Sequence, residues 1–153
     1  MHRHEHYTDS IFYQIEQTAK YCRYLGFQVF QKLNIEITPD EFYAMDIIMQ
    51  NESICQRELA RLILKDRPTT GRILSSLEEK GYIDRFVDTK NNRLVRRMRL
   101  TASGISVTKD ASSKIKDYIS KLPKIFSDED KVELINLIMQ FRQSLEKEVE
   151  MNI

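Results

Sequence analysis

Residues 56–100 read QRELARLILKDRPTTGRILSSLEEKGYIDRFVDTKNNRLVRRMRL. Apolar residues recur at helical spacing through the first part, which predicts a short helix over residues 56–64. Asp66 then suits the cap of a second helix, with Pro68 in its first turn. Gly81 is a good stop for this second helix, so the segment predicts two helices joined by a tight break.

The period changes after Gly81, and the pattern becomes that of a hairpin. Residues 82–87 and 93–100 read as strands, and the polar residues 88–92 between them read as a turn. The second strand is rich in arginine, so the hairpin is basic. The order short helix, break, second helix and basic hairpin is that of a winged helix-turn-helix.

Longer helices flank this segment on both sides. A helix is expected over residues 9–33, and Thr38-Pro39-Asp40-Glu41 predicts a capping box that opens another helix ending near residue 51. Helices follow over 102–122 and from residue 128. The last one carries an apolar stripe that is either core or partner-facing, made of Leu134, Leu137, Ile138, Phe141, Leu145 and Val149. The fold class is therefore mainly α with a small β-hairpin wing, in one compact domain, with residues 1–8 disordered.

Composition excludes several classes of protein. The chain has 153 residues, 41% hydrophobic and 31% charged, which suits one soluble domain. Four glycines and three prolines are few for a large sheet. No apolar run is long enough for a transmembrane helix or a secretory signal, and two cysteines make no disulfide framework. A cytoplasmic location is expected, with no membrane, metal or cofactor.

Charge is concentrated in the centre of the chain. Residues 56–101 hold twelve Lys/Arg and six Asp/Glu, although the net charge of the whole chain is only +1. A basic centre between acidic ends favours a polyanion as partner, and a solvated charged face is the alternative.

Several side chains of the two helices and the hairpin suit contacts with double-stranded DNA. Arginine can donate two hydrogen bonds to one guanine. The threonine hydroxyl can bond a phosphate or a base edge, and its methyl group can contact the methyl group of thymine. Gly71 would let the helix backbone approach the duplex closely. The major-groove residues are expected to be Arg67, Thr69, Thr70, Arg72 and Ser75, supported by Gln56, Arg57, Arg93 and Arg97. An ordinary exposed helix face and a charged strand edge are the alternatives.

Four motifs resemble the MarR-type transcriptional regulators: Gln56-Arg57-Glu58-Leu59-Ala60, then Asp66 through Arg72, then Leu77-Glu78-Glu79-Lys80-Gly81-Tyr82-Ile83, and finally Leu100-Thr101-Ala102-Ser103-Gly104. The resemblance covers nearly the whole chain. It implies a homodimer held by its first and last helices (within residues 9–37 and 102–153), with the winged helix over 38–101. It also implies binding to palindromic promoter DNA, usually as a repressor that a small molecule or an oxidant releases.

The wing departs from the family pattern. Members commonly carry Asp-x-Arg before the second strand, whereas this chain has Asn92-Arg93-Leu94. A wing salt bridge built on that aspartate is therefore not expected, and Arg93 is the predicted wing-tip residue.

Two kinds of signal are compatible with the sequence, an oxidant and a small aromatic molecule. Cys22 and Cys55 are candidate redox sensors, although oxidant-sensing relatives carry their cysteine earlier in the first helix, and a buried apolar role is the alternative. The resemblance implies a pocket for a small aromatic effector, for which Tyr24, Phe27, Phe42 and Met45 are candidates unless they are core.

Other function classes are less favoured. The histidines lie only at positions 2, 4 and 6, so a metal site there is not preferred, and no nucleotide loop or catalytic constellation indicates an enzyme. A winged-helix protein–protein adaptor remains the rival, and it would need exposed apolar residues on the second helix.

Overall fold

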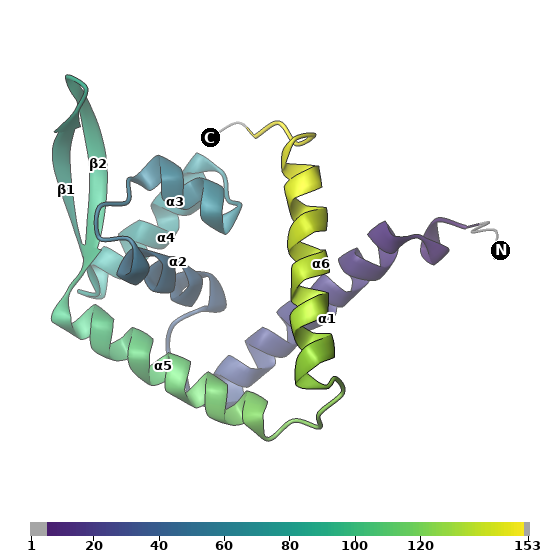
Figure 1. The fold of residues 1–153 in the computed structure, drawn as a ribbon. Helices are drawn as coiled ribbons and strands as arrows, with labels where there is room; N and C mark the ends of the chain where they lie inside the picture. Colours follow the sequence, from purple (N-terminus) through teal and green to yellow (C-terminus); the bar gives the residue numbers. More distant parts are fainter. Residues whose placement is uncertain (1–5, 152–153) are drawn as a thin grey trace.

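The computed structural model describes residues 6–151 and confirms a mainly helical fold with one hairpin (Figure 1). The strands form a two-stranded antiparallel sheet. After a short 3₁₀ helix, Tyr7–Asp9, the elements in chain order are α1 (Ile11–Lys32), α2 (Pro39–Gln50), α3 (Gln56–Ile63), α4 (Arg67–Glu79), β1 (Ile83–Lys90), β2 (Arg93–Leu100), α5 (Ala102–Ser120) and α6 (Asp128–Glu146).

The start of the chain is more ordered than expected from residue 7 onward. The 3₁₀ helix at residues 7–9 corrects the expectation of disorder there. Tyr7 Oη donates to Glu16 Oε2 at 3.3 Å, and Ser10, which caps α1, accepts from the Tyr13 N–H. These bonds tie the segment to the first turns of α1. The prediction for residues 1–5 falls outside the described residues.

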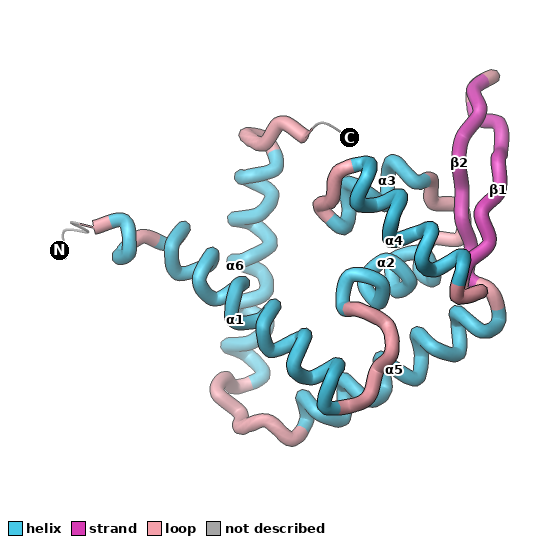
Figure 2. The backbone as a smooth tube through the Cα atoms, turned by 180° about the vertical axis from the view of Figure 1, so that it is seen from behind, coloured by secondary structure: helices cyan, strands magenta, loops and turns pink. Residues whose placement is uncertain are grey.

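The core lies around α2, between α3, α4, α5 and the base of the hairpin (Figure 2). The predicted capping box at Thr38 and Glu41 is present and starts α2 where the sequence indicates. The inner side chains of α2 are fully buried, as are those that meet them from the other elements. This cluster includes Ala44, Met45, Ile48, Leu59, Leu74, Leu77, Ile83 and Met98.

The hairpin is longer and its turn tighter than the sequence analysis predicted. Strand β1 continues to Lys90, which pairs with Arg93 of β2, so the five-residue turn expected over 88–92 is wrong. Only Asn91 and Asn92 form the turn, and both have positive φ, at 53° and 62°. Asparagine tolerates this conformation, and two such residues in sequence make the turn that matches strand twist.

The junction between the wing and α5 explains the spacing of two of the motifs. Thr101 Oγ1 donates to the Gly81 carbonyl at 2.6 Å and accepts from the Gly104 N–H, which caps α5. A Cβ at Gly104 would overlap the carbonyl oxygen of Tyr82, so only glycine fits there. The base of the hairpin is thus locked to both α4 and α5.

The terminal helices leave much apolar surface uncovered. Helix α6 crosses α1 beside the winged helix, and Phe12 meets Phe141 edge to face with ring centroids 5.3 Å apart (Figure 1). The stripe on α6 is not core: Leu137 is 54% exposed, and Leu134, Ile138 and Val149 are also exposed. No helix within residues 6–151 is long and apolar enough to cross a membrane.

Candidate nucleic-acid interface

Helix α4 begins with a strong cap and presents polar side chains beside it. Asp66 accepts from the Thr69 N–H at 2.7 Å, and this bond above all holds the pKa of Asp66 below its ordinary value. Arg72 donates to Thr69 Oγ1 at 3.0 Å. Arg67 and Arg72 are exposed and Thr69 is half-buried, so these three lie on the accessible side of α4.

Thr70 does not lie on that side. Its side chain is fully buried, so the expectation that it faces the groove is wrong. Thr70 precedes Leu74 by four residues and Leu77 by seven, and this spacing places all three on the inner face of the helix. No hydrogen-bond partner for Thr70 Oγ1 is found among the described residues.

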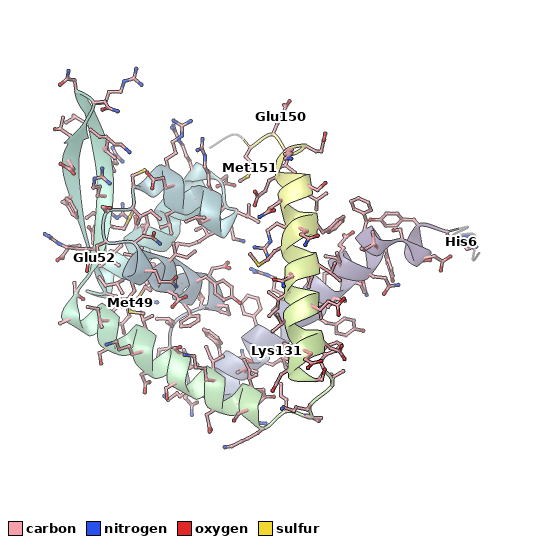
Figure 3. The ribbon with its side chains drawn as sticks, viewed as in Figure 1. His6, Met49, Glu52, Lys131, Glu150 and Met151 are labelled. Carbon is pink, nitrogen blue, oxygen red and sulfur yellow. The ribbon has the colours of Figure 1, made fainter. Side chains whose placement is uncertain are left out.

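A cleft of about 1050 Å³ separates the starts of α3 and α4 from the wing. Five of the predicted DNA contacts line it: Gln56, Arg57, Arg67, Arg93 and the buried Thr70. Lys90 and Arg96 complete the positive lining, and nitrogen-tipped side chains project from the wing tip (Figure 3). Lys90 was missed because the sequence placed it in a turn, whereas it pairs with Arg93 at the end of β1.

Two predicted DNA contacts are instead engaged within the protein. Arg97 is an internal bridge: its side chain is only 12% exposed, its Nε lies 2.9 Å from Asp88 Oδ2, and it donates to the Ser53 carbonyl. Ser75 is exposed, but its hydroxyl accepts from Arg85 Nη2 at 2.8 Å.

Arg85 contacts α4 beside the candidate interface, and the sequence did not predict this role. From β1 it donates to the Gly71 carbonyl at 3.3 Å as well as to Ser75, and its Nε lies 3.9 Å from Glu78 Oε2. These contacts attach the wing to α4. The wing therefore has its own ionic links, Arg85 to α4 and Arg97 to Asp88, in place of one built on the family aspartate.

The candidate sensing residues are scattered. Cys22 is exposed on α1, whereas Cys55 is half-buried in the cleft and its thiol donates to Glu58 Oε1 at 3.2 Å. Tyr24 and Phe27 are exposed, but Met45 is fully buried in the core, so it is not available to line a pocket with them. Phe42 stacks edge to face on Phe30 of the core.

Nothing within residues 6–151 indicates a metal centre. No group of three or more histidine, cysteine or acidic side chains there is placed to hold an ion. His6 is exposed, and His2 and His4 lie outside the described residues.

Comparisons with known proteins agree with this geometry. The model of the MarR family matches residues 37–95, which hold α2, α3, α4, β1 and the turn. An uncharacterised helix-turn-helix transcriptional regulator, YybA of Bacillus subtilis, is 24% identical over 117 residues, covering 76% of this chain and 77% of YybA.

Solved structures share the fold over nearly the whole chain. A MarR protein from Peptoclostridium difficile matches with a TM-score of 0.76 at 20% identity, covering 97% of this chain and 95% of its own. MepR of S. aureus, in a complex with DNA, matches with a TM-score of 0.72 at 20% identity, covering 92% and 99%. The family model and the solved structures agree on the winged helix, so residues 37–95 match the MarR family and hold a winged helix beside a basic cleft.

Proposed function

We propose that the protein is a cytoplasmic dimer that binds palindromic promoter sites and represses transcription until a small effector or an oxidant releases it. The observation that carries the DNA part is the cleft between α4 and the wing, lined by Arg57, Arg67, Lys90, Arg93 and Arg96. Five positive side chains around one opening suit two phosphate backbones on either side of a groove.

Helix α4 is the proposed reader of the major groove. Arg67, Thr69 and Arg72 lie on its accessible side, and Gly71 between them carries no side chain. Arginine at this position forks onto guanine, and the hydroxyl of threonine bonds phosphates or base edges. Arg93 and Arg96 on the wing then reach the neighbouring minor groove or its phosphates.

The test is binding to duplexes recovered by selection from a random library with the wild-type protein. Arg72→Ala is expected to cost about 1–3 kcal/mol of binding free energy and to relax the preference at one base pair. Lys116→Ala on α5, which runs away from the wing tip, is the matched control and should bind as wild type (Figure 1). Equal weakening on every sequence would make Arg72 a phosphate contact instead.

The dimer is supported by the apolar surface of the terminal helices. Exposed large apolar side chains of α1 and α6 include Ile11, Phe12, Leu25, Phe27, Leu134, Ile135, Leu137 and Met139. A monomer rarely leaves so many apolar groups in water on two crossing helices, so a second copy is the proposed cover.

Leu137→Asp tests the dimer without touching the core, because Leu137 is more than half exposed in the protomer. Sedimentation should give a folded monomer with a helical circular-dichroism spectrum. Val87→Asp on the wing, at a similar exposure, should stay dimeric. A stable Leu137→Asp dimer would refute the interface.

A thiol switch is the alternative for release, because Cys55 lies in the cleft itself and Cys22 is exposed. Binding to the selected duplex is measured before and after mild peroxide, and again after dithiothreitol. Loss that dithiothreitol reverses, and that Cys22→Ser or Cys55→Ser removes, supports the switch. Binding that peroxide leaves unchanged favours a small aromatic effector.

The adaptor reading is less well supported. None of the large exposed apolar side chains lies within α4, the surface that an adaptor would use.

A further inference from the structure

Asp40, in the first turn of α2, contacts two other parts of the chain. Its carboxylate accepts from both terminal nitrogens of Arg23 on α1, with Nη1–Oδ1 at 3.4 Å and Nη2–Oδ2 at 3.2 Å. Lys65 Nζ, from the turn between α3 and α4, lies 3.6 Å from the same Oδ2. One carboxylate thus links the first helix to the turn of the helix-turn-helix.

The next residue attaches α2 to α4. Glu41 is only 4% exposed, and its carboxylate accepts from Ser76 Oγ at 3.1 Å and from Lys80 Nζ at 2.9 Å. Its other oxygen accepts from the Thr38 N–H. Because these bonds are partly buried and charge-assisted, they hold the first turn of α2 against the C-terminal half of α4.

The residue of α1 that contacts Asp40 lies about two turns from the place where α1 enters the core. Phe30 is the buried anchor of α1 and packs edge to face on Phe42 of α2, with centroids 5.9 Å apart. Arg23 precedes Phe30 by seven residues, which is about 10 Å along the helix. Phe30 on Phe42 and Lys32 over the ring of Tyr118 both lie near the C-terminal end of α1, whereas a contact about two turns earlier constrains the angle of the helix more firmly.

A contact within α1 limits the conformations of the Arg23 side chain. Its guanidinium lies over the ring of Phe27, 5.2 Å from the centroid, which limits the conformations of a long side chain. A planar guanidinium on a carboxylate is directional, because two parallel bonds require one relative orientation. An ammonium in its place would tolerate many orientations.

We propose that Asp40 is a positioning residue that fixes the angle between α1 and the winged helix, and so selects the spacing of the two operator half-sites. This proposal rests on the proposed function, since spacing has meaning only for a dimer on a palindrome. If α1 lies in the dimer interface, its angle to each winged helix sets the separation of the two copies of α4. The half-sites must then match that separation along the duplex.

The experiment compares spacings on one operator sequence. Palindromic duplexes selected with the wild-type protein are rebuilt with one base pair more or fewer between half-sites, which turns one half-site by roughly 34°. Wild type should prefer the selected spacing strongly. Asp40→Asn should reduce that preference about fivefold or more, whereas its affinity for a duplex with a single half-site should stay within about twofold of wild type.

Arg23→Gln is the second variant, chosen because its side chain is half exposed and its loss does not disturb the core. It should reduce the preference for the selected half-site spacing to the same degree. The double variant should keep as much preference for the selected spacing as either single variant, because both substitutions remove the contact between Arg23 and Asp40. Exposed ion pairs add little stability, so melting temperatures should change by at most about 3 °C.

Asp110→Asn is the matched control, because Asp110 pairs with Lys114 on the surface of α5 at 3.2 Å. It should keep the wild-type preference. If Asp40→Asn and Arg23→Gln also keep it while wild type discriminates, the positioning role is refuted and the DNA-binding proposal stands. If wild type selects no palindrome at all, the proposed function fails, and this inference fails with it.

Discussion

Arg97 of β2 lies diagonally opposite Asp88 of β1, and its Nε is 2.9 Å from the aspartate carboxylate. The same guanidinium donates to the Ser53 carbonyl in the loop between α2 and α3. One side chain therefore joins both strands of the wing to the body of the winged helix. The bonds to the carboxylate, from the Thr89 N–H first and then from Arg97, hold the pKa of Asp88 below its ordinary value.

Replacing Arg97 should loosen the wing without removing a phosphate contact. We expect Arg97→Gln to weaken binding to all duplexes by a similar factor. The slope of log K against log salt should stay unchanged, because that slope counts neutralised phosphates. Hydrogen exchange of β1 and β2 amides should become faster. A slope that falls by about one would instead make Arg97 a backbone contact.

Arg93 should behave in the opposite way. It is exposed at the first position of β2 and lines the cleft. Arg93→Ala is expected to lower the salt slope by about 0.9, the value for one lost phosphate contact. Arg99→Ala on the same strand is the control, because Arg99 lies over the Phe86 ring and not in the cleft. Equal slopes for Arg93→Ala and wild type would remove Arg93 from the interface.

Local signals predicted most of the fold. The caps at Thr38 and Asp66 and the stop at Gly81 are properties of neighbouring residues, and the structure has each of them. The burial of Thr70 was also readable, since it shares the helical spacing of the inner leucines of α4. Because the side chain of Thr70 is polar, it was instead predicted to lie on the exposed face of α4.

Contacts between distant residues were not predictable in this way. The bridge from Arg97 to Asp88 depends on strand register, and register depends on a two-residue turn that was taken for five. Lys80 meets Glu41 across 39 positions, and Arg23 meets Asp40 across 17. Periodicity carries no information about such pairs, because only tertiary packing brings them together.

We expect glycine at position 71 to strengthen DNA binding while it lowers the stability of the fold. A Cβ there would meet only Gln56 Nε2, at an ordinary 3.9 Å, and glycine inside a helix costs about 1 kcal/mol relative to alanine. Gly71→Ala should therefore raise the free energy of unfolding in urea by about 1 kcal/mol, while it weakens binding to the selected duplex.

Gly26 on α1 provides the matched control for that substitution. A Cβ there would lie 4.0 Å from Tyr43 Oη, again without a clash. Gly26→Ala should be stabilised to a similar extent, with affinity for the selected duplex unchanged. If Gly71→Ala bound DNA as tightly as wild type, close approach of the helix backbone at this position would be excluded.

Glu41 should make stability depend on acid pH. Burial alone raises the pKa of Glu41, but bonds from the Thr38 N–H, Lys80 and Ser76 outweigh burial and hold the pKa below its ordinary value. A carboxyl whose pKa is lower in the folded state stabilises the fold fully above its unfolded pKa, about 4.3. That contribution is lost as pH falls from there through the folded pKa, because protonation then releases Lys80.

Glu41→Gln keeps the shape of the side chain and removes this titration. We expect it to lower the free energy of unfolding by about 1–3 kcal/mol at pH 7, since Lys80 is partly exposed and still reaches water. The gap between wild type and Glu41→Gln should shrink as urea denaturation is repeated from pH 6 down to pH 3. Glu129→Gln, exposed on α6, should show no such gap. A gap that stayed constant over this range would mean that packing of the side chain, and not its charge, holds α2 to α4.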